Sequence, residues 1–179
     1  MPASRSLRVA ILLISCTPVL AQVTISSSTA DWILDGVHLT GTFGAHVGPA
    51  GDIDGDGYGD VLIGDSLFDG GFVNSGRISL HRGSADGLLT TPAWSLEGSV
   101  AGALMMIAFP AGDVNGDGYD DVIVSGAVPG MLSLYSGSPT GLSPTSWLHA
   151  GASVGHGDIN GDGFSDVAVG SYSLVEIYM

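Results

Sequence analysis

The feature that most constrains this chain is a nine-residue loop, rich in Asp and Gly, that occurs three times. We call the three copies loops 1, 2 and 3; they span residues 52–60, 113–121 and 158–166. Each has Asp or Asn at positions 1, 3 and 5, glycine at positions 4 and 6, an aromatic residue at position 7 and Asp at position 9. The carboxylates of each loop are close enough in sequence to repel one another unless a cation lies between them. The pattern therefore predicts a cation-binding loop in each copy.

Calcium is the cation that this donor set favours. It takes about six to eight oxygen ligands in a flexible shell at about 2.3–2.6 Å, which alternate side chains of a tight loop can supply. Glycine at position 6 permits the positive φ that turns the chain around the ion, and position 7 offers its backbone carbonyl. Magnesium retains its waters and prefers fewer carboxylates. Zinc favours Cys and His ligands, which the loops lack.

The loops differ from the EF-hand, which is the common twelve-residue calcium loop. An EF-hand requires an acidic ligand at position 12 and a helix on either side. Position 12 in this chain is Ile63, Val124 or Val169, each within an apolar run typical of a buried strand. The last acidic residue stands at position 9 instead. We therefore expect a calcium loop between two strands.

This spacing resembles the FG-GAP repeat, the blade unit of the integrin alpha-subunit propeller. Loop 1 lies within a full signature that includes Phe43-Gly44 and Ala50-Gly51-Asp52. The second copy retains Ala111-Gly112-Asp113 but not Phe-Gly, and the third retains little before Gly157. The resemblance covers about residues 30–179. It implies an all-β protein of propeller-type blades, with calcium in the blade loops and partners that meet loops on one face.

The ligand set expected from the loop pattern and the resemblance comprises side-chain oxygens at positions 1, 3, 5 and 9 and the carbonyl at position 7. The side-chain ligands are Asp52, Asp54, Asp56, Asp60, Asp113, Asn115, Asp117, Asp121, Asp158, Asn160, Asp162 and Asp166. The carbonyl ligands are Tyr58, Tyr119 and Phe164. About three structural Ca²⁺ per chain are expected, because each loop supplies enough oxygens to leave little open coordination.

The repeat extends beyond the loops and divides the chain into units. Residues 31–179 form the FG-GAP region, with units at 31–92, 93–145 and 146–179, and a Trp-containing segment near the start of each. The third unit is truncated and has a shortened connection before its loop, so a degraded first strand is expected there. Three units are too few for a closed propeller, which needs about four to eight blades. A partial or open propeller is expected, either as a fragment or associated with itself or with further FG-GAP blades.

The first 21 residues are typical of an export signal. Arg5 and Arg8 precede a short apolar run, and cleavage is expected after Ala21, with residues 22–30 as a linker. The alternative is a bacterial lipid-attachment signal at Cys16. Both readings place the protein outside the cytoplasm: extracellular, periplasmic or at the cell surface. The apolar run is too short for a transmembrane span.

Charge and cysteine content narrow the function classes further. Beyond residue 21, Arg77 and Arg82 stand against 18 acidic residues, so nucleic acid is not expected as a partner. Cys16 is the only cysteine, which excludes an intrachain disulfide and leaves bound metal as the available cross-link. The expected partner is a protein or a glycan of unknown identity.

A hydrolase is the enzymatic alternative. Gly64-Asp65-Ser66-Leu67 matches the first block of GDSL hydrolases, in which the serine is the nucleophile. The other blocks of that family are missing, and a nucleophile without its base is inert. The five histidines recur at no common repeat position, so no shared catalytic role follows from them. The sequence therefore favours a non-enzymatic binding or adhesion module with no catalytic residues.

Overall fold

The computed structural model describes residues 32–36, 42–102 and 107–179. The predicted export signal, its predicted cleavage site and Cys16 lie outside these residues. Residues 34–179 belong to one compact unit. All regular structure in the described residues is strand, and they include no helix that could cross a membrane.

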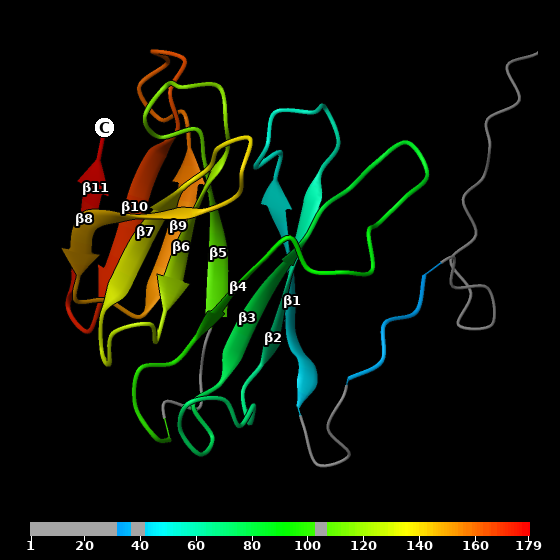
Figure 1. Cartoon of the computed structure of the whole chain (residues 1–179). Coiled ribbons are helices and arrows are strands. Elements are labelled where there is room, and N and C mark those ends of the chain that lie inside the picture. Colours follow the sequence, from blue (N-terminus) through cyan, green and yellow to red (C-terminus); the bar gives the residue numbers. More distant parts are fainter. Residues whose placement is uncertain (1–31, 37–41, 103–106) are drawn as a thin grey trace, which may run out of the picture. The chain divides into compact units, whose positions relative to one another are not determined.

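Eleven strands form three antiparallel sheets, in each of which spatial order follows chain order (Figure 1). The first sheet contains β1 (Phe43–Gly51), β2 (Asp60–Asp65), β3 (Arg77–His81) and β4 (Trp94–Glu97). The second contains β5 (Ile107–Gly112), β6 (Asp121–Ser125), β7 (Leu132–Ser136) and β8 (Ser143–His149). The third contains β9 (Ser153–Gly157), β10 (Asp166–Ser171) and β11 (Leu174–Tyr178).

Each sheet is thus a meander of the kind that makes a propeller blade. The first strands of neighbouring sheets lie together, β1 against β5 and β5 against β9. No strand of the third sheet pairs with the first in the described part of the chain, so the array is open. The expectation of an all-β fold of propeller-type blades, partial or open, is confirmed.

The sheets are held together by two apolar clusters between their faces. The first joins the first two sheets, with Leu62 and Leu80 on one side and Val122 and Val124 on the other. The second joins the second and third sheets and includes Ile123, with valines of β10 opposite. Fully burying one such side chain contributes about 1.5–3 kcal/mol, so these face-to-face contacts supply much of the folding free energy.

The sequence units and the sheets are offset by one strand. Trp94 and Trp147 stand near the start of the second and third units in sequence, yet they lie in β4 and β8, the last strands of the first and second sheets. Trp94 makes an edge contact with Tyr135 of the following sheet, with ring centroids 5.5 Å apart. Each of these tryptophan segments therefore completes the sheet of the unit before it.

The expectation of a degraded first strand in the third unit is wrong. β9 is formed and pairs with β10 from Ser153↔Gly170 to Gly157↔Asp166. The shortening falls instead in the connection that precedes the strand, because only residues 150–152 separate β8 from β9.

Candidate metal sites

The three loops occupy the same place in their sheets, between the first and second strands, at the upper end in Figure 1. Position 1 follows the first strand directly, and position 9 opens the second. In the first two sheets the pairing skips one residue near the loop, Ala50 or Ala111. The paired glycine that follows, Gly51 or Gly112, has a φ of 89° or 69°. A bulge of this kind bends the strand and aims the loop.

The loops share a hydrogen-bond pattern that draws their oxygens inward. In loop 1 the carboxylate of Asp52 accepts the N–H groups of Asp56 at 3.0 Å and Gly57 at 2.8 Å. Asp56 in turn accepts the N–H of Tyr58 at 2.9 Å. The equivalent bonds recur in loops 2 and 3. The glycines at positions 4 and 6 all have positive φ, as the sequence pattern predicts.

The structure brings Asp52, Asp54 and Asp56 together, with one oxygen of each within 4.8 Å of the others. Oxygens on opposite sides of a calcium ion at about 2.3–2.6 Å are about 5 Å apart, so one ion fits among them. Arg82 is the nearby protein cation: its Nε lies 3.0 Å from Asp54 Oδ2. Loops 2 and 3 carry Asn115 and Asn160 at position 3, and these accept the same backbone N–H as Asp54.

The position 9 carboxylates are buried. Asp60 accepts N–H groups from Ile53 at 3.1 Å and Gly83 at 2.9 Å. Asp121 accepts them from Val114 and Gly137, and Asp166 from Ile159 and Asn160. These aspartates therefore tie each loop to the sheet beneath it.

Two of the position 9 carboxylates, Asp60 and Asp121, are harder to ionise than a free aspartate because their pKa is raised. Burial raises the pKa of Asp60 above its ordinary value, and the charges of Asp54 and Asp56 act in the same direction against the lowering effect of the N–H donors. The pKa of Asp121 is raised for the same reasons, chiefly burial. A dication in the loop would favour the ionised form. The chemistry of the donor set thus fits calcium.

The position 7 aromatics connect each loop to the loop before it. The ring of Tyr119 lies over Gly55 and that of Phe164 over Gly116, both position 4 glycines. A Cβ added to Gly55 would lie 2.8 Å from the Tyr119 ring, and one added to Gly116 would overlap Phe164. In loops 1 and 2, glycine at position 4 is therefore required for two reasons: its positive φ and the aromatic ring that covers it.

Replacing Gly116 with Ala is expected to destabilise the chain more than replacing Gly161. Both glycines occupy position 4 with similar φ, 74° and 80°, so both substitutions introduce backbone strain of about 1–3 kcal/mol. Only Gly116 lies against a ring, since a Cβ on Gly161 has open space around it. Overpacking adds about 1–3 kcal/mol, which chemical denaturation of both variants would resolve. Equal losses would contradict the aromatic contact.

Position 8 supplies a contact between loops that the sequence pattern did not indicate. The N–H of Asp120 donates to the carbonyl of Asp52 at 3.0 Å, and its carboxylate accepts the N–H of Asp52 at 2.8 Å. Ser165 repeats the first of these bonds with Asp113. Position 8 is Gly, Asp or Ser in the three loops, so no repeated residue type could have identified it.

The Ser66 side chain contacts another hydroxyl group. Its hydroxyl lies 2.7 Å from that of Thr42, which is also within 3.5 Å of an Asp65 oxygen. No hydrogen bond joins Ser66 to a histidine in the described residues. This arrangement is a polar contact at the end of β2, without the geometry of an activated nucleophile.

Comparison with known families gives the same assignment as the loop geometry. A model of the FG-GAP-like repeat matches residues 52–124 and 113–169. The chain belongs to the FG-GAP repeat family. The two matched segments include all three FG-GAP loops and the strands between them.

Curated relatives of this FG-GAP chain are integrin alpha subunits. It is 30% identical to human integrin alpha-IIb over 112 residues, 60% of the chain and 10% of that protein. It is 32% identical to chicken integrin alpha-V over 111 residues, 59% of the chain and 10% of that protein. It is 30% identical to Xenopus laevis integrin alpha-5 over 132 residues, 71% of the chain and 12% of that protein. The matches thus span about a tenth of these relatives.

Proposed function

We propose that this chain is an exported, non-enzymatic binding or adhesion module whose blades are stabilised by calcium. The observation that carries the proposal is the threefold recurrence of one loop geometry, with acidic oxygens directed inward at the same place in each sheet. The similarity to integrin alpha subunits supports adhesion as the general role.

The proposed ligands are those predicted from sequence. Positions 1, 3, 5 and 9 supply side-chain oxygens in every loop, and Tyr58, Tyr119 and Phe164 supply carbonyls. Calcium at these sites would offset the repulsion among carboxylates and hold the loop closed over the sheet. Its role is structural, and the partner, a protein or a glycan, would meet loops at the blade ends. Residues 1–21 are proposed as the export signal, 22–30 as a linker and 31–179 as the repeat region.

Counting bound ions tests this proposal. Equilibrium dialysis of the chain is expected to give about three Ca²⁺ per molecule, one per loop. The double variant Asp54→Asn, Asp56→Asn removes two charges from loop 1 and should bind about two. Asp86→Asn is the matched control, because Asp86 is an exposed acid in a turn outside the loops. A chain that binds no calcium, or a loop 1 variant that binds as many ions as the control, would overturn the assignment.

A further inference from the structure

Each sheet has one apolar face, and the residues that form it stand at equivalent positions in the three sheets. They are position 2 of the loop, one residue of the second strand and two residues of the third strand. In the first sheet these residues are fully buried against the second sheet: Ile53, Leu62, Ile78 and Leu80. In the second sheet they pack against the third: Val114, Ile123, Leu132 and Leu134. In the third sheet they are Ile159, Ala168, Val175 and Ile177.

The third sheet leaves this face exposed. Ile159 is 56%, Val175 67% and Ile177 52% accessible to solvent. The glycines beside the face are open as well: a Cβ on Gly157 or Gly161 would meet nothing within 4 Å. Their equivalents in the first two sheets are crowded by the next loop. An exposed apolar patch with these properties marks an interaction surface.

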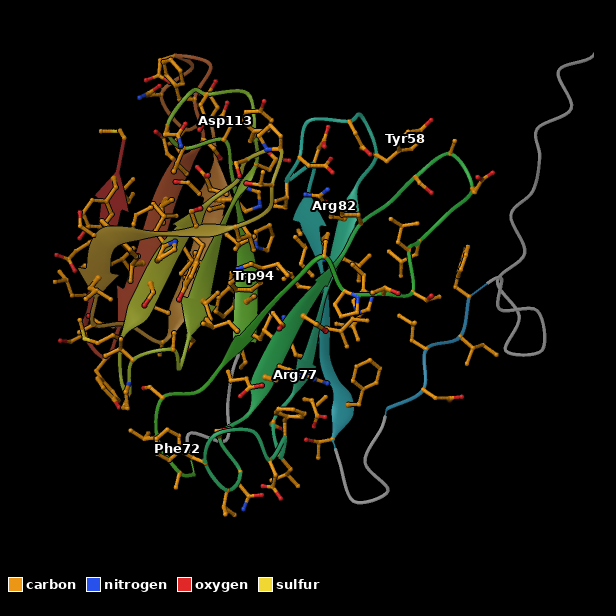
Figure 2. The ribbon with its side chains drawn as sticks, in the orientation of Figure 1. Tyr58, Phe72, Arg77, Arg82, Trp94 and Asp113 are labelled. Carbon is orange, nitrogen blue, oxygen red and sulfur yellow. The ribbon has the colours of Figure 1, made fainter. Side chains whose placement is uncertain are left out.

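The first strand and the loop of the first sheet carry the exposed part of the complementary face, whereas Ile63, Ser79 and His81 on the same face are buried. Val47 pairs with Ile63, the position held by Ala108 and Val154 in the next two sheets. Those two residues pack in the apolar clusters between sheets, whereas Val47 is 61% exposed. Tyr58, labelled in Figure 2, holds the aromatic position of loop 1 and is 44% exposed. Position 8 of this loop is Gly59. Its backbone N–H is equivalent to the N–H groups of Asp120 and Ser165, which donate to the preceding loop.

We infer that the third sheet of one chain docks on the first sheet of a second copy, head to tail. The contact repeats the interface that the chain already forms twice within itself. Tyr58 of one copy covers Gly161 of the other, as Tyr119 covers Gly55 and Phe164 covers Gly116. Val47 enters the apolar face around Ile177. The N–H of Gly59 donates to the carbonyl of Asp158, as Asp120 and Ser165 donate to Asp52 and Asp113.

The docking centres on the first strand and the loop. Farther out, Ser79 and His81 face a cavity of about 150 Å³ that Leu34, Thr90 and Pro92 also line. His81 Nδ1 is 3.0 Å from the carbonyl of Leu89. Among the described residues, the chain's own segments thus border the outer part of the first sheet, whereas Val47 and Tyr58 are exposed to a second copy.

Two copies are the expected assembly. A head-to-tail contact either closes into a ring or continues as a filament. Two copies bring six sheets together, within the about four to eight blades that close a propeller, whereas three copies would bring nine.

The test measures mass by sedimentation, in calcium-containing buffer, for the chain and three variants. Ile177→Asp and Val47→Asp each place a charge in one half of the interface at an exposed site that the fold tolerates. Each is expected to weaken dimer formation about thirtyfold or more, because an unpaired charge would be buried. Tyr172→Asp is the matched control: Tyr172 is fully exposed between β10 and β11, outside the interface, so this variant should remain dimeric.

Mixing the two variants decides the geometry. Neither variant dimerises alone, but the pair retains one intact half on each partner, so an equimolar mixture is expected to form a 1:1 dimer. A wild-type chain that stays monomeric overturns the inference, as does a mixture that stays monomeric. A Val47→Asp variant that still dimerises also overturns it, since two third sheets would then face each other. The calcium bound by the same samples is measured separately. Loss of dimer formation with three bound ions would overturn only the docking inference, and a dimer without bound calcium would overturn only the metal proposal.

Discussion

Removing calcium with a chelator is expected to lower the melting temperature of the chain by about 20–30 °C, or to abolish cooperative melting altogether. Each ion at about 100 times its dissociation constant stabilises the fold by about 2.7 kcal/mol, so three ions contribute about 8 kcal/mol. That equals a large part of the about 5–15 kcal/mol by which a typical domain is stable. Circular dichroism of the strand signal during heating measures the change.

Magnesium provides the control for this experiment. At the same concentration it should restore little of the lost stability, because it prefers fewer carboxylates and retains its waters. Re-addition of calcium should restore the original melting curve. A melting curve that does not respond to the chelator would show that the three loops fold without an ion, and would contradict the structural role.

Replacing Asp121 with Ala is expected to lower the free energy of unfolding by about 2–6 kcal/mol. The buried carboxylate accepts the N–H groups of Val114 and Gly137, and each unpaired buried donor costs about 1–3 kcal/mol. Asp121→Asn should lose less, because its carbonyl oxygen retains one of the two bonds. Urea unfolding in saturating calcium measures both variants.

The same Asn variant separates a hydrogen-bonding role from a metal-binding role. The free energy of unfolding rises with the logarithm of calcium concentration in proportion to the ions bound on folding. If Asp121 is a ligand, Asp121→Asn should reduce this slope from about three ions towards two. An unchanged slope would restrict Asp121 to its two backbone partners and leave the ion to the other oxygens of loop 2.

The local geometry of the loops was predictable because it depends on residues within nine positions of one another. Glycine at positions 4 and 6 predicts positive φ, and Asp52, Asp54 and Asp56 at alternate positions predict oxygens directed inward. The apolar runs after each loop predict buried strands, and β2, β6 and β10 follow. The all-β fold and the family assignment come from these local signals.

Contacts between units could not be predicted in the same way. Asp120 reaches Asp52 across 68 residues, and the chain carries a different residue type at each position 8. Arg82 approaches Asp54 because the turn after β3 returns to the loop end of the sheet, which a linear pattern does not reveal. The membership of Trp94 in the first sheet depends on strand pairing and so required the structure.

The one-strand offset between sequence units and sheets has a consequence for how such chains grow and shrink. A duplication of one sequence unit inserts the last strand of the previous sheet together with the first three strands of the next. The inserted unit therefore pairs with the preceding sheet through backbone hydrogen bonds. Conversely, deleting residues 93–145 removes β4 from the first sheet. The segment that contains Trp147 then follows β3 in the sequence and can take the place of β4. Shuffling at unit boundaries therefore exchanges strands of like kind and preserves complete sheets, whereas shuffling at sheet boundaries transfers a whole blade, residues 43–97 or 107–149, as one cassette.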